Sequence, residues 1–156
     1  MIKSVLTTLL LLATLTVGCA ASRPSAEPPV FVAERINWCG PNWVTSFSPT
    51  EAIQKVDDTC IRPGQYTRRF EPTSDQWAAT QAAFEANGFA SLPEEITTTP
   101  DSEGRITIVT DDLKSCISFA GRRVCGANHA LTHTPEGERF LRIWSSLAAI
   151  APEPVH

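Results

Sequence analysis

The chain has 156 residues, of which 42% are hydrophobic and 19% are charged, and its formal net charge is −4. This length suits a single compact domain built around one hydrophobic core. The acidic balance argues against nucleic acid as a partner, because neutralising phosphates requires a basic surface.

The N-terminal segment has the pattern of a secretory signal peptide. Lys3 supplies a positive charge, and the apolar stretch from Val5 to Val17 follows it. As a helix this stretch would be about 20 Å long, which is shorter than the hydrocarbon core of a bilayer. We therefore expect removal of residues 1–18 rather than a permanent membrane span.

The run Leu15-Thr16-Val17-Gly18-Cys19 resembles the lipobox of bacterial lipoproteins, although Thr16 stands where that family favours an aliphatic residue. The resemblance implies that Cys19 becomes the new N-terminus and carries diacylglycerol and fatty acids such as palmitate. The acyl chains would anchor the chain to a membrane. Ala20, in place of aspartate, implies the outer membrane, with the protein facing the periplasm. An ordinary signal peptide, cleaved among Gly18, Ala20 and Ala21, remains the alternative.

Composition divides the remaining chain into three parts. Residues 19–29 are rich in proline and serine and poor in apolar side chains, which predicts a lipidated tether. Residues 30–151 are expected to form a single domain, and residues 152–156 a short tail.

The sequence of the first half of the domain predicts alternating strands and helices. We expect a strand over 30–36, a turn at Gly40-Pro41-Asn42 and a short helix over 49–58, because Ser48 and Glu51 have capping-box spacing. A strand over 65–70 should follow. The next helix should begin at Thr73 or Ser74 and end at Gly88, with Phe89 packed on Phe84.

The second half predicts a three-stranded meander and a helix. A loop from Asp111 to Lys114 would pair Ile108 with Ile117, and a turn at Ala120-Gly121 would pair Cys116 with Cys125. An amphipathic helix should begin at Thr134-Pro135 and cover the apolar face of the meander. The expected fold is therefore α+β: a small antiparallel sheet packed by two main helices and stapled by disulfides.

The five cysteines are consistent with an oxidising compartment. Acylation of Cys19 leaves four, and Cys116 and Cys125 occupy a cross-strand position that favours a disulfide. Cys39 and Cys60 would then pair, although the spacing alone leaves the other connectivities open.

Two motifs suggest a chemical function, disulfide exchange in one and metal binding in the other. For both, a purely structural role is favoured over that function. Trp38-Cys39-Gly40-Pro41 resembles the start of the thioredoxin active site, but Asn42 replaces the second cysteine that disulfide exchange requires. His129 and His133 have the spacing of paired metal ligands on a helix, but the segment looks like a loop and lacks a strong third ligand. We therefore expect no cofactor, no metal and no enzymatic activity.

The sequence thus favours a periplasm-facing lipoprotein that acts by interaction, as an inhibitor-like module or a binder of another envelope protein. The expected contacts are exposed aromatic and arginine side chains, which often anchor interfaces: Trp38, Trp43, Arg122 and Arg123. The order of elements is diffusely similar to that of small bacterial lipoprotein domains without an assigned activity. The alternatives are a small periplasmic hydrolase or metal-binding protein that uses His129 and His133, and a purely structural envelope component.

Overall fold

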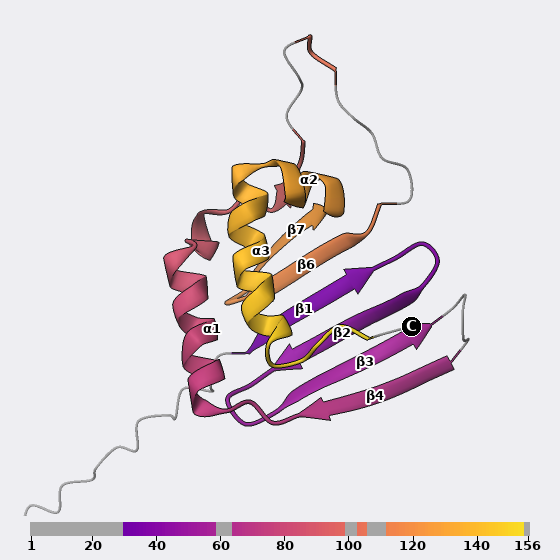
Figure 1. The fold of residues 1–156 in the computed structure, drawn as a ribbon, viewed down its shortest axis with the longest axis vertical. Helices are drawn as coiled ribbons and strands as arrows, with labels where there is room; N and C mark the ends of the chain where they lie inside the picture. Colours follow the sequence, from indigo (N-terminus) through magenta and orange to yellow (C-terminus); the bar gives the residue numbers. More distant parts are fainter. Residues whose placement is uncertain (1–29, 59–63, 99–102, 106–111, 155–156) are drawn as a thin grey trace, which may run out of the picture.

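A computed structural model describes residues 30–58, 64–98, 103–105 and 112–154. These residues form an α+β fold in which helices pack on a seven-stranded, mostly antiparallel sheet (Figure 1). In chain order the elements are β1 (Phe31–Ile36), β2 (Pro41–Phe47), β3 (Ala52–Asp58), β4 (Gly64–Phe70), α1 (Ser74–Ala86), the 3₁₀ turn η1 (Phe89–Ser91), β5 (Glu95–Ile96), β6 (Lys114–Phe119), β7 (Arg122–Ala127), α2 (Asn128–His133) and α3 (Pro135–Ala148).

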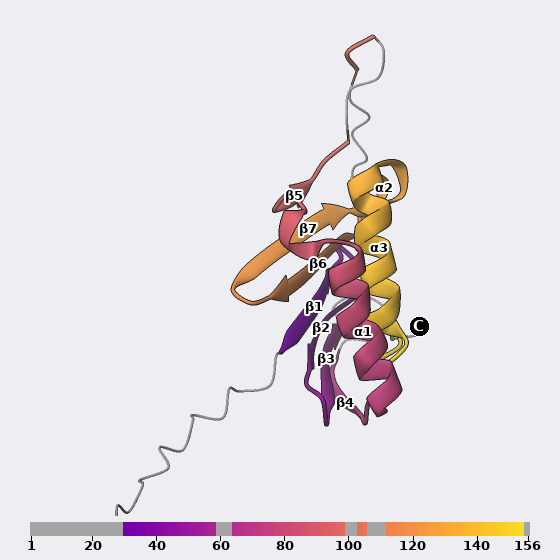
Figure 2. The same cartoon turned by 90° about the vertical axis from the view of Figure 1, so that its left-hand side faces the viewer.

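The strands lie in the order β4-β3-β2-β1-β6-β7-β5, so β1 joins the two halves of the sheet. Every neighbouring pair is antiparallel except β5 and β7, which are parallel. Helices α1 and α3 lie side by side on one face of the sheet, as the two views of the ribbon show (Figures 1 and 2). Over strands β1 to β4, no described helix covers the opposite face (Figure 2).

The core lies between the sheet and these two helices. Helix α3 contributes its predicted stripe of Phe140, Ile143, Trp144 and Leu147, all of which are buried. Both main helices begin as the sequence predicts: Thr73 and Gln76 form a capping box, and the Thr134 side chain accepts a hydrogen bond from the Gly137 N–H. At the end of α1, Gly88 has a φ of 58°, and Phe89 packs against Phe84 with ring centroids 5.0 Å apart.

The prediction of a helix over 49–58 is wrong, because residues 52–58 of this segment form strand β3. The expected hydrogen bond from the Glu51 N–H to Ser48 Oγ does exist, at 3.0 Å, but it closes the turn between β2 and β3. The buried side of β3 includes Gln54, which is satisfied by Thr45 Oγ1 at 3.1 Å and by Arg68 at 3.1 Å. A polar residue on the buried side hides the alternation that marks a strand.

The β6–β7 hairpin has the predicted register, with Ile117 opposite Val124 and Cys116 opposite Cys125. Its two-residue turn places Ala120 and Gly121 at φ values of 51° and 78°, which suits the twist of a tight hairpin. The predicted disulfide between Cys116 and Cys125 is present, with Cα atoms 4.1 Å apart.

The sheet is larger than the expected meander, and β6 has a different neighbour. The strand expected before the Asp111–Lys114 loop, which contains Ile106 and Ile108, lies outside the described residues. Ile117 instead lies opposite Ala33 of β1, so β1 occupies that edge of β6. The segment expected to be a loop before Pro135 is also different, because residues 128–133 form helix α2.

Several predictions concern residues outside the described ranges. They include the signal peptide, Cys19 and the tether over 1–29. Cys39 is disulfide-bonded, and its expected partner Cys60 lies outside the described residues. In the described part of the chain, no helix combines the length and the apolar character needed to cross a bilayer.

Candidate functional site

The uncovered face of the sheet carries two rows of side chains that run across β1 to β4. Because directly opposed residues of antiparallel strands share a face, the register defines each row. The first row contains Glu34, Val44, Lys55 and Thr67. The second contains Asn42, Asp57 and Gln65, and Ile36 lies on the same side of β1. We call these eight residues the open-face site.

The row between them points to the helices and fixes the strands from beneath. It contains Arg35, Trp43, Val56 and Tyr66. The Trp43 ring packs on Trp144 of α3, with centroids 5.3 Å apart. The Arg35 guanidinium lies 5.1 Å from the centroid of the same Trp144 ring and forms an ion pair of 2.9 Å with Glu153. Trp43 and Val56 are buried, so the open-face site rests on a packed layer beneath β2 and β3, whereas Tyr66 on the edge strand β4 is 47% exposed.

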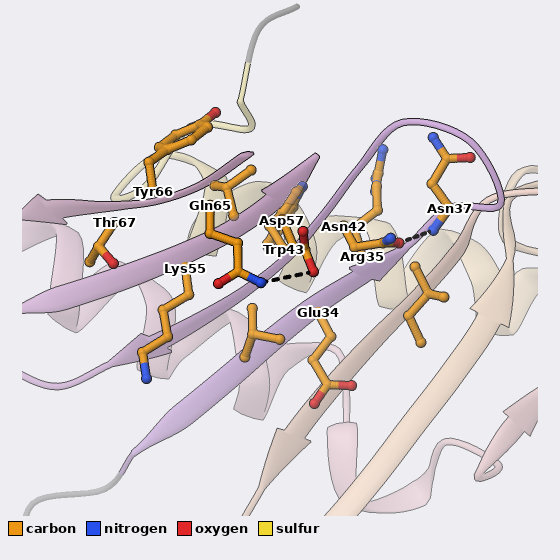
Figure 3. A pocket seen from close by; sticks show the side chains of 13 residues that line it. Glu34, Arg35, Asn37, Asn42, Trp43, Lys55, Asp57, Gln65, Tyr66 and Thr67 are labelled. Atoms are coloured by element: carbon orange, nitrogen blue, oxygen red, sulfur yellow. Dashed lines mark hydrogen bonds between the residues drawn. The ribbon is translucent and has the colours of Figure 1, made fainter. Parts of the chain in front are cut away.

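All eight residues of the open-face site line one hollow of about 650 Å³, together with Asn37 and the row beneath (Figure 3). This volume lies within the range of ligand-binding pockets. Figure 3 shows the Gln65 side chain turned to Asp57, and Gln65 Nε2 donates to the Asp57 carboxylate at 3.4 Å. Asn42 Oδ1 accepts a hydrogen bond of 2.6 Å from the Asn37 N–H, which fixes the start of the turn after β1.

Charges of both signs lie on this face. Glu34 forms an ion pair of 2.6 Å with Arg123 of β7, so its carboxylate is partly neutralised. Asp57 is exposed, and Gln65 is the hydrogen-bonding partner that the structure gives its side chain. Lys55 is exposed on the neighbouring row. The hollow therefore offers hydrogen-bond donors, acceptors and both charges to a ligand.

Apolar side chains are exposed in the same place. Among the described residues, five large hydrophobic side chains are exposed, and two of them, Ile36 at 46% and Val44 at 41%, belong to the open-face site. A third, Trp38, is 78% exposed and directly follows Asn37 at the rim of the hollow. Such a combination of apolar and polar groups is typical of protein interfaces.

The expected contact residues do not form one surface. Trp38 is exposed as expected, but Trp43 is only 5% exposed, because it belongs to the row that faces α3. Arg123 is exposed and paired with Glu34. Arg122 turns away from it and donates a hydrogen bond to the Leu92 carbonyl.

The structure brings His129 and His133 together, because both lie on helix α2. Their ring centroids are 4.2 Å apart, and His133 Nδ1 lies 2.8 Å from the His129 carbonyl oxygen. The Asp112 carboxylate accepts a hydrogen bond of 2.7 Å from the backbone N–H of His129, near the start of α2. In the described ranges, no group of three or more histidine, cysteine, aspartate or glutamate residues is placed to hold a metal ion.

The open-face site could not be predicted without recognising β2 and β3 as paired strands. A signal for β2 exists: Pro41, Trp43, Thr45 and Phe47 alternate with Asn42, Val44 and Ser46. Reading Thr45 as a buried residue would have completed that alternation and placed Asn42 and Val44 together on the other face.

No protein-family model matches this chain, and no curated protein matches it either.

Proposed function

We propose that the chain is a periplasm-facing lipoprotein, anchored to the membrane through Cys19, whose open-face site binds another protein of the envelope. The signal-peptide pattern and the lipobox-like run at Leu15–Cys19 support the anchor. The open-face site supports the binding role. On this proposal the domain acts by holding a partner rather than by catalysis.

The observation that carries the binding role is the exposure of Ile36 and Val44 in one hollow, with Trp38 exposed in the turn that directly follows Asn37. Soluble domains seldom expose large apolar side chains together unless a partner covers them. Aromatic side chains in particular supply much of the binding energy of interfaces. Ile36 and Val44 lie on strands that are packed from beneath, so this part of the surface is preformed and loses little entropy on binding.

The chemistry of the hollow favours a polypeptide segment as the bound group. Asn42, Gln65 and Thr67 offer the amide and hydroxyl groups that pair with peptide bonds. Ile36 and Val44 offer apolar contacts for side chains between them. A segment with a basic residue near Asp57 would add charge complementarity.

Site-specific photo-crosslinking in intact cells tests this proposal. A photoreactive benzoyl-phenylalanine replaces Lys55 in the open-face site, and a matched control replaces Gln81, which is exposed on α1. We expect one discrete crosslinked protein from position 55 and none from position 81. Trp38→Ala in the position 55 variant should reduce that product several-fold.

Two outcomes would contradict the proposal. Identical products from positions 55 and 81 would mean that the crosslinks record crowding rather than a specific surface. The lack of any product at position 55, with folded protein in the membrane fraction, would favour a purely structural component.

A further inference from the structure

A second cavity lies at the C-terminal end of α1, away from the open-face site. It has a volume of about 340 Å³. Its apolar lining comes from Phe84, Phe89, Ala90, Phe119 and Ala120, so it combines the end of α1, the η1 turn and the β6–β7 hairpin. Apolar cavities of this size accept ligands with hydrocarbon parts.

The aromatic rings of this cavity hold one another in place. Phe84 packs against Phe89 at 5.0 Å and against Phe119 at 5.3 Å between ring centroids. Phe31, the first residue of β1, stacks on Phe84 at 4.3 Å. Since each ring is fixed by its neighbours, the cavity is preformed.

Arg122 supplies a positive charge to the wall of this apolar cavity. One of its terminal nitrogens donates to the Leu92 carbonyl, while its Nε is buried and has no hydrogen-bonding partner among the described residues. Within the same residues, Arg122 forms no ion pair, whereas its neighbour Arg123 pairs with Glu34. Arg122 thus lines the cavity without a counter-ion among the described residues, and a bound carboxylate would supply one through a charge-assisted hydrogen bond to the guanidinium.

We propose that this cavity binds a free fatty acid, with the hydrocarbon tail against the phenylalanine rings and the carboxylate on Arg122. The apolar lining selects the tail, and the positive charge of Arg122 selects the acidic head group. Glu85 also lines the cavity, but it is exposed, so water screens its charge. This inference does not depend on the open-face site or on acylation of Cys19.

Photolabelling tests the proposal on the full-length chain in membrane vesicles. The probe is a decanoate analogue that carries a diazirine on its tail and an alkyne for detection. We expect labelling within the cavity lining, mapped by mass spectrometry of digested protein. Unlabelled decanoate should compete, and each methylene added from hexanoate to decanoate should improve competition about fourfold. Decanol, which lacks the carboxylate, should compete at least about tenfold less well.

Three variants separate the two parts of the proposal. Arg122→Gln should reduce labelling by about tenfold or more, while the matched control Arg123→Gln leaves it unchanged. Ala90→Trp, at an exposed position of the lining, should fill the cavity and abolish labelling. Circular dichroism of each purified variant checks that the fold is retained.

The alternative results are distinct. Equal labelling of the Arg122→Gln and parent proteins, or equal competition by decanol, would overturn the role of the carboxylate. Labelling outside the cavity lining would overturn the site itself. Labelling that arises only after Cys19→Ser would show that the chain's own acyl group occupies the cavity, which would also overturn binding of a free fatty acid.

Discussion

The indole rings of Trp43 and Trp144 pack against each other with their centroids 5.3 Å apart, which joins β2 to α3. Glu153 extends this contact, because its carboxylate accepts a hydrogen bond of 3.0 Å from Trp144 Nε1 and pairs with Arg35. The side of β2 that faces α3 is thus fixed by packing, and no described helix covers its other side (Figure 2).

Trp43→Ala should lower the free energy of unfolding by about 3–5 kcal/mol, because the change leaves a cavity beneath β2. Trp38→Ala is the matched control: the side chain is 78% exposed, so its loss should change stability by less than about 0.5 kcal/mol. Guanidinium unfolding of both variants measures the difference. Equal effects would contradict the assignment of Trp43 to the core.

Gly137→Ala should destabilise the domain although alanine is the better helix former. A Cβ at Gly137 would lie 2.5 Å from the Leu131 Cα and 2.6 Å from its carbonyl carbon, where α2 and α3 meet. Backbone atoms cannot rotate away as a side chain can, so we expect a loss of about 2 kcal/mol after the propensity gain is included. Thermal unfolding, with Ser145→Ala on the exposed side of α3 as control, provides the measurement. An increase in the melting temperature would refute the close approach of the two helices.

Replacing both Cys116 and Cys125 by alanine should reduce the free energy of unfolding by about 2.5 kcal/mol, since the bond closes a short loop in the unfolded chain. We expect the variant to remain folded, because the β6–β7 hydrogen bonds and the core beside them do not depend on the disulfide. Denaturant unfolding without reductant compares it with the parent protein, and an unchanged midpoint would mean that the bond adds nothing.

Cys19→Ala should prevent stable attachment to the membrane or block removal of residues 1–18. The expectation follows from the lipobox-like run, in which the cysteine thiol receives the lipid. Fractionation of cells and intact mass measurement of the mature chain check it, with Ser25→Ala as a control within the expected tether. Equal processing and equal membrane association of the two proteins would refute lipidation.

The parts of the fold that the sequence predicted are those where local signals and burial agree. Thr73 and Gln76 form a capping box at the start of α1, and apolar residues recur along α3 from Phe140 to Leu147. The β6–β7 hairpin was equally predictable from the sequence, because the loop length and the hydrophobic alternation impose the same register.

The missed elements have weak or misleading local signals. In β3 the buried Gln54 takes the place of an apolar residue, and its hydrogen bonds to Thr45 and Arg68 depend on the pairing of β3 with β2 and β4, which the local sequence does not reveal. The residue before helix α2, Ala127, has no side chain that could cap it, so no residue marks the start of this helix. The open-face site depends on the pairing of four strands, which no local pattern contains.

The position of β1 has a mechanical consequence. Val32 lies opposite Ser46 on one side and Ser118 on the other, so the strand that follows the expected tether is bonded along both edges. A pulling force applied through the N-terminal segment along β1 would have to shear two hydrogen-bonded ladders at once, instead of peeling an edge strand. If the proposed anchor and partner are correct, tension between them would therefore load a strand that is hydrogen-bonded on both sides.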